Sequence, residues 1–124
     1  MGLSVSNDVI DAALAVIATC TRLDITSDAG TPTDLTNTLA NVTLTAGDGN
    51  GDYTIGDGDT SGRKLTIAAQ SDITPTGNGT GKHLVLSLSG TIHYTTTITD
   101  QALTTAQTFD IPAFDHEIRD PQAE

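Results

Sequence analysis

The stretch KHLVLSLSGTIHYTTTIT, residues 82–99, decides the fold of this chain. Apolar residues alternate with polar ones on both sides of a Ser-Gly pair: Leu84, Leu86 and Leu88 before it, and Ile92, Tyr94 and Ile98 after it. This two-residue period predicts an antiparallel β-hairpin. The two apolar sets meet on one face only if Leu88 lies opposite Ile92, which requires a three-residue loop, Ser89–Thr91. A two-residue turn would place an apolar residue opposite His93 and mix the faces.

Shorter segments of the same kind lie on both sides of the hairpin, separated by turns rich in Asp, Gly and Pro. We expect strands at Arg22–Thr26, Thr38–Thr45, Tyr53–Ile55, Lys64–Ala69 and Thr108–Ala113. Pro112 marks the last of them as an edge or an end, because proline cannot donate to a ladder. Many short strands with turn signals between them predict a mainly β fold, an antiparallel β-sandwich or barrel.

One helix precedes the strands, and we expect it at residues 6–20. Ser6 and Asn7 are candidate N-caps, and Asp8 and Asp11 lie in the first turn, where negative charge interacts favourably with the helix dipole. The apolar positions are Ile10, Ala13, Leu14 and Ile17, and Val9, Ala12 and Val16 widen that face. A helix with so wide an apolar face must be covered, either by its own sheet or by a neighbouring chain.

The length of 124 residues fits one domain with a single core. We expect a single domain, 1–124, made of an N-terminal arm (1–5), the helix (6–20), a β-sandwich (21–114) and a C-terminal tail (115–124). The apolar fraction is 36% and aromatic residues are few, so the core is light. Self-association or docking on a larger surface would therefore add stability.

The net charge of −11 arises from 5 Lys and Arg against 16 Asp and Glu. Such a surface repels phosphate backbones, so nucleic acid is not an expected partner. The sequence has no secretory signal and no apolar run long enough to span a bilayer. We therefore expect synthesis in the cytoplasm and no membrane partner. The single cysteine, Cys20, ends the helical pattern and is expected to be a buried small hydrophobe.

No set of residues has the spacing of a catalytic site. Gly81-Lys82 matches the end of a phosphate loop, but His83 stands where Ser or Thr should hold magnesium, and a strand follows where a helix must begin. His83, His93 and His116 are separated along the sequence, and we expect them at exposed polar positions rather than in a metal site. We therefore expect a non-enzymatic protein without a cofactor.

An acidic segment between two expected strands is the strongest local signal. Asp48, Asn50 and Asp52 occupy positions one, three and five of a calcium loop, and Asp59 occupies position twelve. Tyr53 stands where such a loop needs glycine, no glutamate closes the site, and the flanks are strands rather than helices. The segment is either a calcium site or an acidic turn, and we favour the turn.

Four segments resemble a family of small, acidic β-sandwich structural proteins of tailed bacteriophages, which includes proteins of the capsid decoration or cement type. They are Ser6–Leu14, Thr21–Ser27, Gly58–Ala68 and residues 109–121. These segments build the fold and carry no catalytic signature. The resemblance covers most of the chain except Gly47–Asp57, and it implies a protein that assembles into the virion.

The resemblance and the composition together favour a capsid decoration or cement protein that binds and stabilises the outer head shell. The expected partners are the phage major capsid protein or neighbouring virion subunits, with a homo-oligomer forming on the particle. The alternatives are a tail, baseplate or head-to-tail junction component, or a calcium-dependent carbohydrate-binding module. We expect partner contacts at the chain ends: Met1, Gly2, Leu3, Ser4 and Val5, with Asp115, His116, Glu117, Ile118 and Arg119.

Overall fold

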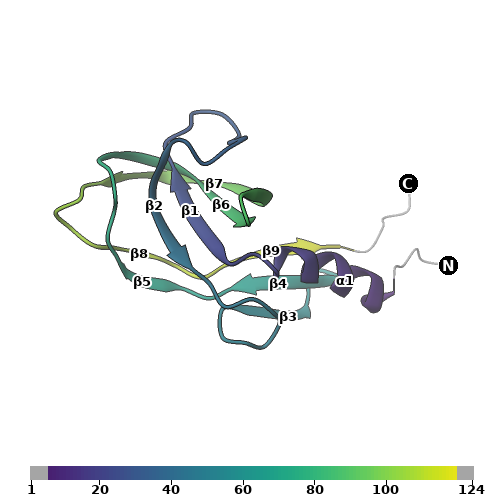
Figure 1. Ribbon diagram of the computed structural model, residues 1–124. Coiled ribbons are helices and arrows are strands. Elements are labelled where there is room, and N and C mark those ends of the chain that lie inside the picture. Colours follow the sequence, from purple (N-terminus) through teal and green to yellow (C-terminus); the bar gives the residue numbers. More distant parts are fainter. Residues whose placement is uncertain (1–5, 120–124) are drawn as a thin grey trace. The chain divides into compact units, whose positions relative to one another are not determined.

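The computed structural model describes residues 6–119, which form one helix and nine strands (Figure 1). The strands form three sheets in which neighbours are antiparallel, and none of these sheets closes into a barrel. The predicted mainly β fold with an N-terminal helix is confirmed, in its sandwich-like rather than its barrel form. Within residues 6–119 no helix has the length and apolar character needed to cross a membrane.

The chain divides into two compact units that interleave along the sequence. The first, here called the helix unit, comprises residues 6–19, 45–69 and 113–119, and the second, the hairpin unit, comprises residues 20–44 and 70–112. Each unit is therefore assembled from segments that are distant in sequence. The expectation of a single domain stays a prediction.

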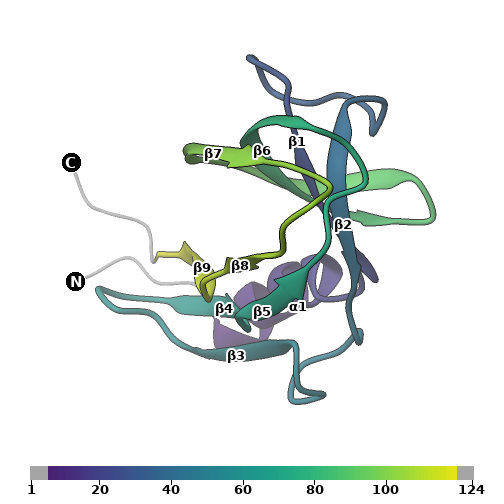
Figure 2. The same cartoon turned by 90° about the vertical axis from the view of Figure 1, so that its left-hand side faces the viewer.

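In the helix unit, α1 (Asn7–Ile17) packs on a sheet of β3 (Tyr53–Asp57), β4 (Arg63–Ile67) and β9 (Phe114–Ile118), in the order β3-β4-β9. Figure 2 shows α1 along one face of β3 and β4. Its core is formed by Ile10, Leu14 and Ala18 from the helix side and by Tyr53, Leu65 and Ile67 from the sheet.

The helix is shorter than the expected 6–20 because both of its ends are capped locally. At the start, the Ser6 Oγ accepts a hydrogen bond from the Asp8 amide at 3.1 Å. At the end, Thr19 donates from its hydroxyl to the Val16 carbonyl at 2.6 Å, which replaces the next helical bond. The following Cys20 is buried, as expected, and burial raises the pKa of its thiol to about 11.

The hairpin unit is built on a sheet of β1 (Arg22–Thr26), β2 (Thr38–Thr43), β6 (Gly79–Leu88) and β7 (Thr91–Leu103). The strand order is β2-β1-β6-β7, and a separate pair joins β5 (Gln70–Ile73) to β8 (Phe109–Ile111). Leu23 pairs with Leu86 and Ile25 with Leu84, so the predicted leucine face of the hairpin becomes one side of this sheet.

The turn of the hairpin corrects the predicted three-residue loop. Leu88 pairs with Thr91, so Ser89 and Gly90 form a two-residue turn, with φ values of 50° and 85°. A positive φ at both central residues is the requirement of a type I′ turn, whose twist matches that of the strands. Ile92 therefore lies opposite Ser87 rather than opposite Leu88 as predicted, and a bulge at His93 shifts the register by one residue and restores Leu86 opposite Tyr94.

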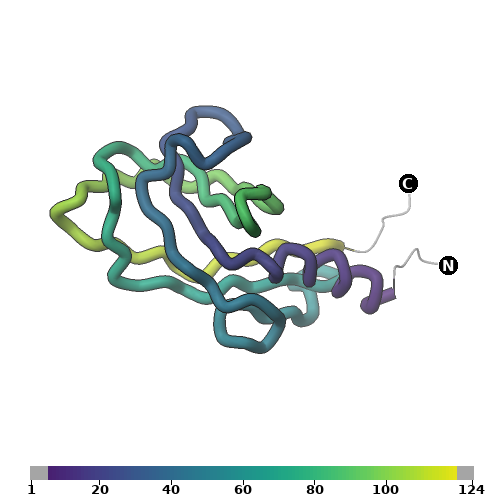
Figure 3. Tube along the Cα trace, in the orientation of Figure 1, coloured from purple at the N-terminus to yellow at the C-terminus, as the bar shows by residue number. Residues whose placement is uncertain are grey.

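The expected C-terminal tail, 115–124, is also corrected, because its first residues belong to β9. This strand pairs with β4 from Arg63 opposite Ile118 to Ile67 opposite Phe114, and Figure 3 shows the yellow end of the chain beside β4. A polar sequence can form this strand because it lies at a sheet edge, where water solvates one side.

Candidate functional site

The outer face of α1 carries an apolar surface that its own sheet does not cover. It consists of Val9, Ala12, Ala13 and Val16, which are all exposed and are spaced at i, i+3, i+4 and i+7; we call it the helix stripe. Val9 is 61% exposed and Val16 is 52% exposed, and they are the exposed large hydrophobic residues of the described chain. The wide apolar face expected from the sequence is therefore only partly buried.

Ion pairs hold this helix in a fixed orientation on its sheet. The Arg63 Nε donates to Asp11 on α1 at 2.8 Å, and its Nη1 donates to Asp57 on β3 at 2.8 Å. The hydrogen bond that Arg63 donates to Asp11 is the largest cause that raises the pKa of Arg63. Because Arg63 is in β4, one guanidinium joins the helix to two strands and keeps the stripe turned outward.

The predicted contact residues at the chain ends have two different outcomes. Residues 1–5 lie outside the described residues. In β9, by contrast, the side chains make contacts within the helix unit: Glu117 accepts from the amides of Thr60 at 3.2 Å and Ser61 at 3.3 Å, and Arg119 pairs with Glu117 at 3.3 Å. These residues therefore complete the fold, and partner binding through them stays a prediction.

The charge of Glu117 is set by these contacts. Partial burial tends to raise the pKa of its carboxyl group, but the amides of Thr60 and Ser61, with Arg119, outweigh burial and lower it. Asp115 lies 3.7 Å from the Lys64 Nζ, which also donates to Asp59 at 2.7 Å. The acidic residues of β9 are therefore balanced by basic residues of the same unit.

In the acidic loop, each candidate calcium ligand contacts a protein group of its own. Asp48 accepts from the Ile55 amide at 2.8 Å, and Asp52 accepts from the Thr45 amide at 2.6 Å. The Asn50 Nδ2 donates to the Ala46 carbonyl at 2.9 Å, and Asp59 accepts from Lys64. In the described part of the chain, no three His, Cys, Asp or Glu residues are placed to hold a metal ion.

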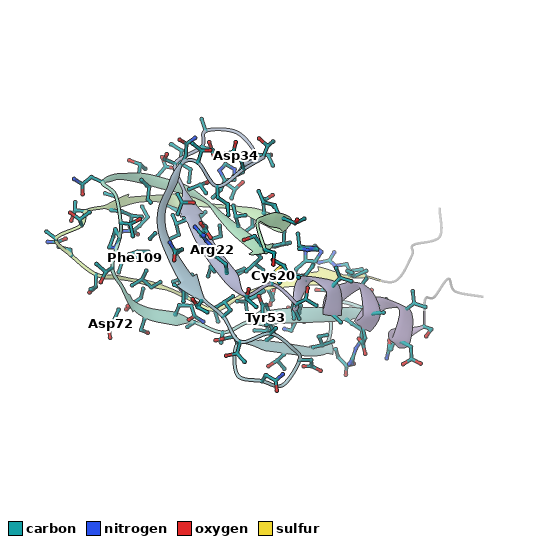
Figure 4. All side chains as sticks on the ribbon, viewed as in Figure 1. Cys20, Arg22, Asp34, Tyr53, Asp72 and Phe109 are labelled. Atoms are coloured by element: carbon teal, nitrogen blue, oxygen red, sulfur yellow. The ribbon has the colours of Figure 1, made fainter. Side chains whose placement is uncertain are left out.

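These contacts are those of a turn. Gly47, Gly49 and Gly51 all have positive φ values, of 101°, 80° and 107°. A side chain at Gly47 would collide with the Asn50 amide. Tyr53 stands at the position where a calcium loop needs glycine. Its side chain is fully buried in the core of the helix unit (Figure 4).

Buried polar residues collect on one face of the hairpin unit, and sequence reasoning missed them. Within residues 6–119 the buried polar side chains are Asp24, Thr26, His83 and Ser87. All four share the face of β1 and β6 that lies opposite the leucines, because Thr26 pairs with His83 and Arg22 pairs with Ser87. We call this the polar face.

Asp24 is the best satisfied member of the polar face. Its carboxylate accepts from the Arg22 Nε at 2.6 Å and Nη2 at 2.8 Å, and from the Thr38 hydroxyl at 2.7 Å. The hydrogen bond to Asp24 raises the pKa of Arg22, which Figure 4 labels on β1.

His83 was expected to be exposed, but it is only 8% exposed. Its Nδ1 lies 2.9 Å from the Asp28 carbonyl, which can only accept, so the Nδ1 carries the proton. Asp28 lies in the 27–37 loop, which thus fastens onto the polar face. His93 is exposed and His116 is half-buried in another strand.

Three buried oxygens in this region have no hydrogen-bond partner in the described structure: Thr26 Oγ1, Ser87 Oγ and Asp28 Oδ2. The Ser87 hydroxyl is not placed as a nucleophile with His83 as its base. Ser87 and His83 are four residues apart on one strand, which separates their Cα atoms by roughly 13 Å at the usual rise per residue. A base must lie within hydrogen-bond reach of its nucleophile.

Comparisons with protein-family models, with curated proteins and with solved structures give no match to this chain.

Proposed function

We propose that this chain is a non-enzymatic structural protein of a tailed-bacteriophage virion, and specifically a capsid decoration or cement protein. It docks on the outer head shell and contacts the major capsid protein or neighbouring virion subunits. The observation that supports this most directly is the helix stripe, with Val9 and Val16 more than half exposed on a helix that buries Ile10 and Leu14 on its other side. Exposed apolar patches on soluble proteins mark interaction surfaces.

The stripe has the properties of a weak contact that is repeated many times. Burying a valine contributes about 1.5–3 kcal/mol, so two valines per copy give a modest gain before ordering costs. Alanines between them allow a partner backbone to approach closely. Many weak contacts on a symmetric shell become strong together, because each bound neighbour raises the effective concentration of the next.

Charge supports the same role. A net charge of −11 on the 124-residue chain keeps unassembled copies soluble and repels packaged DNA, so an outward position on a shell suits it. The stripe itself contains no charged side chain, so docking there does not bury an unpaired charge.

Particle composition tests the proposal. Particles of the phage that encodes the chain are purified, and quantitative mass spectrometry measures the protein relative to the major capsid protein. A decoration protein should approach the abundance of the capsid subunit. An abundance of only a few copies per particle would favour the tail or head-to-tail junction alternative, and absence from particles would overturn the virion assignment.

A pair of variants tests the stripe. Val9→Glu places a charge in the stripe near the helix N-terminus, where a negative charge is tolerated by the helix dipole. Ala15→Glu adds the same side chain on an exposed position outside the stripe. We expect Val9→Glu to lower particle occupancy while Ala15→Glu does not, with both proteins folded by circular dichroism. Equal occupancy of both variants would contradict docking through this surface.

A further inference from the structure

Two Asn-Gly pairs occur in the described chain, and their surroundings differ. Asn50-Gly51 lies in the acidic turn, and Asn78-Gly79 lies at the start of β6. The backbone nitrogen after an asparagine can attack the side-chain carbonyl carbon, and glycine permits this approach because it has no side chain. Sequence alone would give the two pairs the same reactivity.

The Asn50-Gly51 pair is free to react. Both residues are exposed, Gly51 has a φ of 107°, and a Cβ built on it would meet nothing within 4 Å. The Gly51 amide makes no hydrogen bond within residues 6–119. The Asn50 side chain makes one hydrogen bond within residues 6–119, from its Nδ2 to the Ala46 carbonyl, so no donor holds its Oδ1 in place.

The Asn78-Gly79 pair is held in place. The Asn78 Oδ1 accepts from the Thr105 amide at 2.8 Å, which fixes the side-chain carbonyl. Gly79 lies opposite Leu103 in the ladder, and a Cβ on it would press on Leu39 at 3.2 Å. Attack by the Gly79 nitrogen would require this ladder end to open.

We propose that Asn50 is a site of spontaneous deamidation in the native protein and that Asn78 is protected by the fold. The Gly51 nitrogen loses its proton and forms a bond to the Asn50 Cγ, the bond from Cγ to Nδ2 breaks, and the Nδ2 group takes up a proton and leaves as ammonia. The resulting succinimide takes up one water molecule and opens to aspartate or isoaspartate. Water is the sole co-reactant, and no electron transfer is involved.

The modification changes the turn in a defined way. The new carboxylate has no proton to donate to the Ala46 carbonyl, so that hydrogen bond is lost. It also places a third negative charge between Asp48 and Asp52, whose carboxylates cap the amides of Ile55 and Thr45. Repulsion among these charges loosens the turn as the protein ages, independently of what the protein binds.

The test is peptide mapping by mass spectrometry after incubation of the full-length protein at mildly alkaline pH, once folded and once in denaturant. We expect the Asn50 peptide to convert several-fold faster than the Asn78 peptide in the folded protein, and at a similar rate in denaturant. Equal rates in the folded protein, or faster conversion of Asn78, would overturn the proposal. The same preference in denaturant would also overturn it, because the sequence rather than the fold would then set the difference.

Two variants test the deamidation of Asn50 and the loosening of the turn separately. Asn50→Gln should abolish the fast conversion and leave the slow reaction at Asn78. Asn50→Asp should show the lowered melting temperature of the aged protein without incubation. An aged wild type with a fully converted Asn50 and an unchanged melting temperature would contradict the loosening of the turn.

Discussion

At the scale of single residues, Asp24 and Thr26 lie on the same buried face of β1, but only the Asp24 side chain has hydrogen-bond partners there. Asp24 has three donors for its carboxylate, and Arg22, which supplies two of them, keeps 45% of its side chain exposed. Thr26 is fully buried, yet its hydroxyl has no partner in the described structure. A buried hydroxyl without a partner loses its hydration and gains nothing in return.

Replacement of Thr26 by valine should therefore stabilise the protein. Thr26→Val keeps the shape and removes the unpaired hydroxyl, so we expect the free energy of unfolding to rise by about 1 kcal/mol, measured by chemical denaturation. Thr97→Val on the exposed side of β7 is the control and should change little. A clear loss of stability in Thr26→Val would mean that an ordered water satisfies the hydroxyl.

At the scale of elements, the strands that could be predicted from sequence are those with an apolar alternation. β1 was predicted with the observed bounds, and β6 and β7 lie where the leucine and isoleucine pattern placed them. β5 and β9 were missed because edge strands with polar sequences, such as residues 114–118, carry no such pattern. Their pairing depends on partners distant in sequence.

The polar face and the exposure of the helix stripe were less predictable than the strands, because both depend on contacts between residues distant in sequence. The alternation of His83 with Leu84 and Leu86 puts it on the face opposite the leucines, and the observed register agrees. It could not show that the 27–37 loop returns to that face and buries it, because this contact joins Asp28 to a residue far along the chain. The helix stripe was visible as an over-wide apolar face, but its exposure depends on how α1 sits on its sheet.

The hairpin turn gives an element-scale prediction. Ser89 has a φ of 50°, a left-handed conformation that asparagine tolerates better than serine, and Asn-Gly is the preferred type I′ pair. We expect Ser89→Asn to stabilise the protein by less than about 1 kcal/mol, measured as a shift in the denaturation midpoint. A three-residue loop would have no such requirement at this position, so a loss of stability would contradict the observed turn.

The lowered pKa of Glu117 gives a pH dependence for the β9 edge. Because the folded value lies below the unfolded one, which is about 4.3, the charged carboxylate stabilises the fold fully above that pH. This contribution is lost as the pH falls through the lowered folded value. Wild-type stability should therefore drop more steeply than that of Glu117→Gln during acid titration, and parallel profiles would show that the amide contacts of Glu117 have no effect.

At the scale of the whole molecule, the two units carry different features. The helix unit exposes an uncharged apolar stripe, whereas the hairpin unit encloses its polar face. If the stripe is the docking surface, as we propose, a change in its exposed side chains should weaken assembly without unfolding the protein. The central claim is that this stripe contacts a neighbouring subunit on the phage head.

A reconstruction of the intact particle at side-chain resolution tests this claim most directly. We predict copies of the chain on the outer surface of the head, with Val9 and Val16 packed against the major capsid protein or a neighbouring copy. Copies on the head whose α1 faces solvent, or density confined to the tail, would contradict it.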